Sequence, residues 1–230
     1  MYVIIYAVLG VLNLAAELGH FSMVSMLTKI LLMPTLMVYV WQTAGSKDNT
    51  RWVLIALFFS WLGDIFLMFP RDNYSEGARE ALFIAGLVSF LIAHIQYIIA
   101  FIKDIHPYPK VSLLIEKPYL VIPFIVFLFA LLRFLIPHTG VLTFPICIYG
   151  ITIVSMSMTA LNRKNIVTDR SFLLVFSGAL LFVLSDSTIA ITLFYQHFEL
   201  ERIVIMSTYI IAQLCITYGF VLNKTEKNRI

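Results

Sequence analysis

Long apolar stretches separated by short polar segments run along the whole chain. A helix that crosses a bilayer needs about 20 mostly apolar residues, because its backbone polar groups must be hydrogen-bonded within the segment. We predict eight such helices, over residues 2–16, 22–44, 52–69, 80–101, 119–136, 141–161, 171–194 and 202–222. The predicted fold is an all-α, polytopic membrane protein: a bundle of about eight transmembrane helices that forms a single domain over residues 1–230.

The composition argues against a soluble protein. Hydrophobic residues make up 60% of the chain, charged residues make up 13%, and the mean hydropathy is +0.92, which lies outside the range of soluble domains. The basic residues are scattered over short loops and form no patch, so we expect no nucleic-acid partner. We expect an integral, multi-pass membrane protein, located in the plasma membrane if the host is bacterial.

Basic residues in the predicted loops indicate the orientation, because Lys and Arg in short loops stay on the cytoplasmic side. Eleven fall on the side of the termini: Lys47, Arg51, Lys103, Lys110, Lys117, Arg163, Lys164, Arg170, Lys224, Lys227 and Arg229. Four fall on the opposite side: Arg71, Arg79, Arg133 and Arg202. We therefore predict that both termini are cytoplasmic. The first ten residues contain no Lys or Arg, so we expect the first helix to be retained and not cleaved as a signal peptide.

A few ionisable residues lie within the predicted helices, where a charge at the bilayer centre costs about 2.5–3.5 kcal/mol. They are Lys29, Asp64, His94 and Asp186, with Glu17 near the end of the first helix. Counting about 1.5 Å of rise per residue places Lys29, Asp64, Asp186 and Tyr209 roughly 9–13 Å below the non-cytoplasmic surface. Gln213 follows one helical turn below Tyr209, and we expect all these side chains to face the bundle interior.

The fourth predicted helix carries a stripe of four residues that face the same way. Gly86, Phe90, His94 and Tyr97 are spaced by 4, 4 and 3 positions, which places them on one face of a helix. That face is predicted to point into the bundle. A histidine on an apolar helix is more often a buried structural group than a catalytic one, and both interpretations of His94 stay open.

Two interpretations also stay open for the aspartates. Asp64 and Asp186 can be structural, each bonded to a Lys, Tyr or Ser of a neighbouring helix. They can also form a pair for general acid/base chemistry, because two carboxyl groups in a dry site tend to titrate apart. Lys29 can act as a catalytic cation or a phosphate ligand, or it can merely neutralise an aspartate.

Several short motifs follow one another along the predicted helices. They are Lys29 with Pro34, Gly63-Asp64, Gly86 to Phe90 with His94 and Tyr97, Tyr149 with Met156 or Met158, Gly178 to Asp186, and Tyr209 to Gln213. Together they resemble the lysoplasmalogenase (YhhN-like) family of membrane proteins over nearly the whole chain. The sequence departs from the family pattern in one place, because the family has a proline directly after the lysine and here the proline is Pro34.

The resemblance implies hydrolysis of the vinyl ether bond of a lysoplasmalogen in the bilayer, giving a fatty aldehyde and a glycerophospho-alcohol such as glycerophosphoethanolamine or glycerophosphocholine. The implied catalytic pair is Asp64 and Asp186. The substrate-binding residues implied or suggested by position are Lys29, His94, Tyr97, Tyr149, Tyr209 and Gln213. Two carboxyl groups suffice for this chemistry, so we expect no cofactor and no metal. The head group, the alkyl chain and the oligomeric state stay open.

Two other functions compete with this one. An intramembrane aspartyl protease also uses two aspartates in helices, one of them in a Gly-Asp motif such as Gly63-Asp64. A small transporter or proton-coupled carrier, in which buried Asp and Lys exchange partners, is the non-enzymatic alternative.

Overall fold

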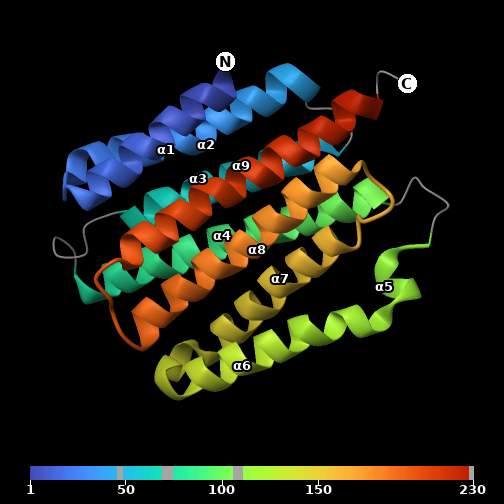
Figure 1. The fold of residues 1–230 in the computed structure, drawn as a ribbon. Helices are drawn as coiled ribbons and strands as arrows, with labels where there is room; N and C mark the ends of the chain where they lie inside the picture. Colours follow the sequence, from blue (N-terminus) through green and yellow to red (C-terminus); the bar gives the residue numbers. More distant parts are fainter. Residues whose placement is uncertain (46–48, 69–74, 106–110, 228–230) are drawn as a thin grey trace. The chain divides into compact units, whose positions relative to one another are not determined.

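The computed structural model describes residues 1–45, 49–68, 75–105 and 111–227, and this part of the chain is helical throughout, with short connections and no strand (Figure 1). The chain divides into two compact units, Met1–Tyr97 and Ile98–Ile230, with the division inside one long helix. The elements in order are α1 (Tyr2–Leu18), α2 (Ser22–Ala44), α3 (Thr50–Met68), α4 (Glu76–Ile105), α5 (Leu113–Glu116), η2 (Pro118–Val121), α6 (Ile122–Thr139), η3 (Gly140–Leu142), α7 (Thr143–Leu161), α8 (Asp169–Phe194) and α9 (Glu201–Lys227).

The first unit is built from α1, α2, α3 and most of α4. Helices α1 and α2 lie side by side, and α3 packs on α2 (Figure 1). Glycines let α3 and α4 approach closely: a Cβ on Gly63 would stand 2.6 Å from the Phe90 ring, and one on Gly86 would stand 2.7 Å from the Leu67 side chain. Small residues at such crossings are how membrane helices maximise van der Waals contact without a hydrophobic driving force.

The second unit is organised around the long α8–α9 pair. These helices lie side by side (Figure 1), and a Cβ on Gly178 of α8 would stand 2.9 Å from the backbone oxygen of Ala212 in α9. Helix α7 packs on α8, and α6 packs on α7 and α8. Helix α6 is the least covered of these helices, because Leu135 and Thr139 are its buried residues.

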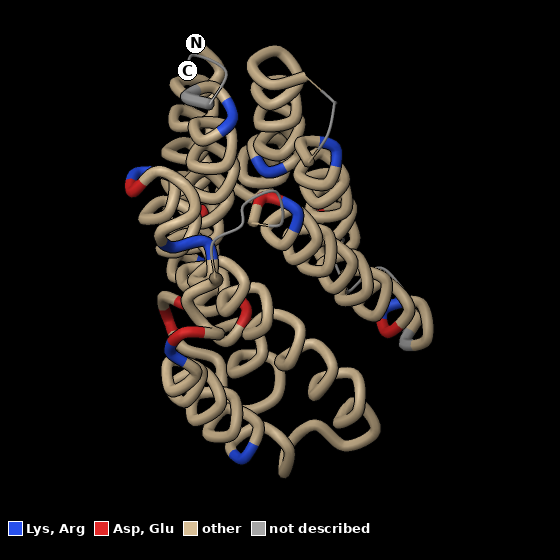
Figure 2. The backbone as a smooth tube through the Cα atoms, turned by 90° about the vertical axis from the view of Figure 1, so that its right-hand side faces the viewer, with Lys and Arg blue, Asp and Glu red and all other residues tan. Residues whose placement is uncertain are grey.

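The helices have the length and composition of membrane spans. Among the described residues, six helical stretches are long and apolar enough to cross a bilayer: Ser22–Ala44, Thr50–Met68, Gly77–Ile105, Pro118–Leu161, Asp169–Phe194 and Glu201–Thr225. One of them, Pro118–Leu161, is 44 residues long and contains both α6 and α7, while α1 is a shorter apolar helix. Figure 2 shows long stretches of helix without a charged residue. The prediction of an all-α, polytopic, integral membrane protein is confirmed; the cytoplasmic position of the termini stays a prediction.

The observed helices differ from the predicted ranges mainly at their ends. Helix α4 spans 30 residues, four beyond the predicted range at each end, and α9 runs five residues beyond it. Polar residues sustain a helix as well as apolar ones do, whereas a hydropathy argument detects only the apolar part. Of the basic residues used to predict the orientation, Lys47, Arg71, Lys110 and Arg229 lie outside the described residues. The single-domain prediction stays a prediction.

Candidate functional site

Asp64 and Lys29 form an ion pair in the first unit. Lys29 Nζ lies 3.5 Å from Asp64 Oδ1, and the side chains are 20% and 4% exposed. An aspartate this deep in an apolar helix is expected to have a partner of opposite charge, because an isolated carboxylate there is costly. The pair brings together two residues predicted for the site, one from α2 and one from α3.

A hydrogen-bond network between α1 and α2 holds the segment that carries Lys29. Asn13 Nδ2 donates to the backbone oxygen of Ser25 at 2.9 Å and to Thr28 Oγ1 at 3.0 Å. Ser25 Oγ donates in turn to Glu17 Oε1. These bonds fix the turn of α2 that immediately precedes Lys29. The sequence offered a signal for this network, since Asn13 is an amide within an apolar helix, a position where interhelical hydrogen bonds are common.

A second bond ties α3 to α2 at the same level. Trp61 Nε1 donates to the backbone oxygen of Ile30 at 3.0 Å. Trp61 stands three positions before Asp64 and Ile30 directly follows Lys29, so the bond sets how these two helices lie against each other beside the ion pair.

Asp186 has a tyrosine partner in the second unit. The hydroxyl of Tyr149, on α7, donates to Asp186 Oδ2, on α8. Asp186 is 8% exposed. Tyr149 was expected at the site only through the family resemblance, and the structure brings it into direct contact with the aspartate.

Contacts between α8 and α9 flank Asp186. Ser185 Oγ donates to the backbone oxygen of Ile205 at 3.1 Å. Phe182, one turn before Asp186, packs edge-on against Tyr209 with ring centroids 5.5 Å apart. Tyr209 and Gln213 are both buried on α9. Tyr209 therefore packs against the helix that carries Asp186, one turn from the carboxyl group.

His94 and Tyr97 lie on α4 within the first unit. Both are fully buried, and Gly86 and Phe90 of the same stripe are buried as well. The predicted inward-facing stripe is confirmed as a buried face of the helix. Whether His94 acts on a substrate or only fills the core is not decided by burial, and its role stays a prediction.

Sequence reasoning missed a buried charge cluster in the second unit. Arg163, which was counted as a loop cation, is completely buried and donates to Asp104 Oδ2 from Nε at 3.3 Å and from Nη2 at 2.9 Å. Asn223 Nδ2 also donates to Asp104 Oδ2 at 3.0 Å, and Lys224 Nζ lies 3.2 Å from Oδ1. Burial lowers the pKa of the Arg163 guanidinium from its usual value, and the charge of Asp104 opposes that effect. An arginine nevertheless stays charged in proteins, so Asp104 is needed as its counter-ion.

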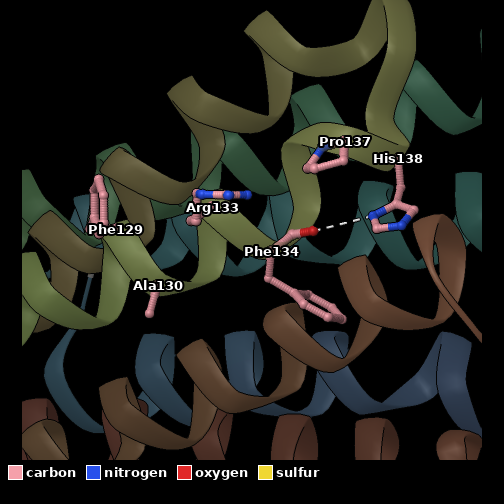
Figure 3. Close-up of a pocket in the computed structure, with 6 residues that line it drawn as sticks. All are labelled: Phe129, Ala130, Arg133, Phe134, Pro137 and His138. Atoms are coloured by element: carbon pink, nitrogen blue, oxygen red, sulfur yellow. Dashed lines mark hydrogen bonds between the residues drawn. The ribbon is translucent and has the colours of Figure 1, made fainter.

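A hollow on α6 is separate from the predicted site residues. It has a volume of about 580 Å³, is open on one side, and is lined by Phe129, Ala130, Arg133, Phe134, Pro137 and His138 (Figure 3). His138 Nδ1 lies 3.2 Å from the backbone oxygen of Phe134. The sequence had assigned Arg133 no role beyond its contribution to orientation.

The structure thus joins the predicted residues into two groups, one in each unit. The first unit holds the Lys29–Asp64 pair, and the second holds the Tyr149–Asp186 bond beside Tyr209. The joint action of Asp64 and Asp186 stays a prediction. Across the described ranges no group of three or more His, Cys, Asp or Glu residues has the arrangement of a metal site.

The sequence is similar to those of known membrane proteins. A sequence profile of the YhhN family matches residues 24–220. Lysoplasmalogenase TMEM86B of Homo sapiens is 29% identical over 181 residues, covering 78% of this chain and 67% of that protein. Lysoplasmalogenase TMEM86A of Bos taurus is 30% identical over 174 residues (74% and 65%), and lysoplasmalogenase TMEM86B of Rattus norvegicus is 30% identical over 197 residues (85% and 72%). The match thus spans about two thirds of the length of these relatives. No solved structure matches the chain.

Proposed function

Because this chain belongs to the YhhN family, we propose that it is a hydrolase that cleaves the vinyl ether bond of a lysoplasmalogen within the membrane. The products are a fatty aldehyde and a glycerophospho-alcohol. The observation that carries the proposal is that the curated relatives named above are lysoplasmalogenases and align over 74% or more of the chain. These relatives do not favour the transporter or the aspartyl protease.

The chemistry needs one proton donor and one group that stabilises a cation. A carboxylic acid protonates the alkene carbon distal to the ether oxygen, which converts the vinyl ether to an oxocarbenium ion. An ionised carboxylate stabilises that cation and takes a proton from the water that attacks it. The hemiacetal that results breaks down to the aldehyde and the free glycerol hydroxyl, so one water molecule is consumed for each bond cleaved.

We assign these two roles to Asp64 and Asp186 as a pair. Each aspartate is buried in an apolar helix and contacts a polar partner on a neighbouring helix, Lys29 for Asp64 and Tyr149 for Asp186. A carboxyl group held by a fixed partner keeps one orientation toward the substrate, which is the usual advantage of a preorganised site. Structural pairing of the aspartates predicts the same contacts, so activity must decide between the two interpretations.

The remaining predicted residues have supporting roles in the proposal. Lys29 is partly exposed and serves as the counter-ion of Asp64. Tyr209 packs on Phe182, one turn before Asp186, and Gln213 is buried one turn further along α9. His94 and Tyr97 occupy the buried face of α4. The alkyl chain lies among the apolar helices, where its burial contributes about 0.8 kcal/mol per methylene. If the host is bacterial, the plasma membrane is the proposed location.

The direct test is hydrolysis in heavy water by the purified protein in detergent. A defined lysoplasmalogen should release an aldehyde that carries one deuteron on the carbon next to the carbonyl, because the transferred proton comes from the exchangeable acid. The products are identified by mass spectrometry. The matched control is the lysolipid with a saturated alkyl ether, which has no alkene to protonate and should remain intact.

Cleavage of the saturated ether would contradict the protonation mechanism. Absence of aldehyde from a demonstrably folded protein, across ethanolamine and choline head groups, would contradict the proposed function itself.

A further inference from the structure

Arg133 stands out among the charged residues because it occupies the most exposed helix of the second unit. Helix α6 exposes large apolar side chains along its length, among them Ile125, Val126 and Phe129 at 58, 60 and 71%. In a membrane-spanning helix such a surface faces lipid. An arginine within it is costly unless its guanidinium reaches the membrane surface or pairs with an anion there. Within the described ranges, no carboxylate lies within ion-pair distance of the Arg133 guanidinium.

The hollow around Arg133 has the composition of a site for an amphipathic anion. Its walls are mostly apolar, from Phe129, Ala130, Phe134 and Pro137, and its polar side chains are Arg133 and His138. The hollow is shallow and largely open, with a volume of about 580 Å³, which suits a group that is only partly enclosed. In Figure 3 the side chain of Arg133 extends toward the part of the hollow where Pro137 and His138 lie.

The hollow is anchored to the helix that carries Asp186. Tyr195, which directly follows α8, packs against Phe134 with ring centroids 4.8 Å apart and against His138 with centroids 5.2 Å apart. His138 is also held by the oxygen of Phe134. The C-terminal ends of α6 and α8 therefore lie together, at the end of the second unit predicted to face the non-cytoplasmic side.

The depths of Arg133 on α6 and Asp186 on α8 follow the order of the phosphate and the vinyl ether in a lysoplasmalogen. Arg133 stands six residues before the end of α6, about 9 Å of helical rise, and Asp186 stands eight residues before the end of α8, about 12 Å. A long arginine side chain reaches from that depth toward the membrane surface. A lysoplasmalogen has its phosphate at the surface and its vinyl ether deeper, in the same order as Arg133 and Asp186.

We propose that the α6 hollow is the phosphate-recognition site for the single-chain phospholipid substrate, with Arg133 bonded to the phosphodiester. This inference rests on the proposed function for the identity of the lipid. A guanidinium binds phosphate oxygens through two parallel hydrogen bonds, and the apolar walls of the hollow cover the first part of the alkyl chain. Arg133 is a specificity residue in this assignment and takes no part in proton transfer.

The test compares two substrates in Arg133→Gln. For a lysoplasmalogen in mixed micelles, KM should rise about tenfold or more, the loss expected for a charge-assisted hydrogen bond, while kcat stays close to that of the parent. For the matching alkenylglycerol, which lacks the phosphate, the variant and the parent should have the same KM. Arg133→Lys should retain part of the discrimination, and Arg79→Gln, an exposed arginine predicted on the same side, is the control that should leave both values unchanged.

A binding measurement tests the phosphate site independently of the proposed hydrolysis. A non-cleavable alkyl lysophospholipid should raise the thermal midpoint of the parent, because a ligand that binds the folded state stabilises it, and should raise that of Arg133→Gln much less. That result would support the site even if no aldehyde were ever released. An equal shift in both proteins, or an equal rise in KM for the alkenylglycerol, would overturn the assignment and leave Arg133 as a residue that contacts bulk lipid only.

Discussion

At the scale of single residues, each buried Asp or Arg in the described part of the chain has a specific partner from another segment of its unit. Lys29 accompanies Asp64, Tyr149 accompanies Asp186, and Arg163 accompanies Asp104. The sequence predicted that the first two aspartates face the bundle interior, because an ionisable residue within an apolar helix is easily recognised; a bond to a Lys, Tyr or Ser was one of the two interpretations that it left open. It did not predict the Asp104–Arg163 pair, because both residues follow the ends of predicted spans. They are also 59 positions apart, and a local sequence pattern does not reveal a contact between residues so distant in the sequence.

The bond between Tyr149 and Asp186 predicts a catalytic defect on removal of one oxygen atom. Tyr149→Phe removes the donor to Asp186 Oδ2, and loss of a hydrogen bond to a charged group is worth about 1.5–3 kcal/mol. We expect kcat to fall roughly 10-fold to 100-fold with a changed pH dependence, because the carboxylate loses its fixed neighbour. The control Tyr119→Phe removes an exposed hydroxyl and should change neither kcat nor its pH dependence. A Tyr149→Phe enzyme with parental kcat and pH profile would place Asp186 outside the reaction.

The Asp104 cluster predicts a defect of stability and not of catalysis. Asp104→Asn leaves the guanidinium of Arg163 completely buried without its counter-ion, a change that costs about 3–5 kcal/mol. We expect a clearly lower thermal midpoint in detergent, while the protein that remains folded releases aldehyde at the parental rate. Arg170→Gln, an exposed change at the start of α8, should stay within about 0.5 kcal/mol of the parent. An unchanged midpoint in Asp104→Asn would mean that the cluster does not hold these helices together.

At the scale of the helices, glycines set the contacts that position the aspartates. The sequence identified Gly63, Gly86 and Gly178 as members of motifs, and the structure gives their physical reason, which is close approach to a neighbouring helix. The apolar pattern predicted the middle of each long helix but not its ends, since α4 and α9 continue through polar residues. It did not predict the short helix α5, which lies in a stretch expected to be a loop. It also gave no sign that α6 carries an open hollow, because a hollow depends on which side chains neighbouring helices leave uncovered.

Gly178→Ala should loosen the α8–α9 pair. The new Cβ would stand 2.9 Å from the backbone oxygen of Ala212, which cannot move unless α9 shifts. Overpacking of this kind costs about 1–3 kcal/mol, and the displaced turn lies two turns before Asp186. We expect a lower thermal midpoint together with reduced aldehyde release. Gly77→Ala is the matched control, because nothing lies within 4 Å of its added Cβ; a loss of stability in the control as large as in Gly178→Ala would refute the packing explanation.

At the scale of the whole molecule, the two aspartates are carried by different compact units, Asp64 by residues 1–97 and Asp186 by residues 98–230. The sequence was sufficient for the class of fold, because a chain this apolar has few alternatives to a helical membrane bundle. It was sufficient for the family because ordered motifs spread over most of the chain. The sequence did not show that the two aspartates act together, because a sequence pattern does not reveal which carboxyl groups contact the same substrate. Their joint action is therefore the central proposal.

The joint action of the aspartates is tested by measuring aldehyde release and the thermal midpoint for three variants. They are Asp64→Asn, Asp186→Asn and the double variant. Asn keeps the size of the side chain and removes its acid/base capacity. We predict that each single variant loses turnover while remaining folded, and that the double variant is no worse than either, because residues that act as a unit are not additive. Retained release in both single variants, or a loss of release that only follows a loss of folded protein, would contradict the account and favour structural roles for the two aspartates.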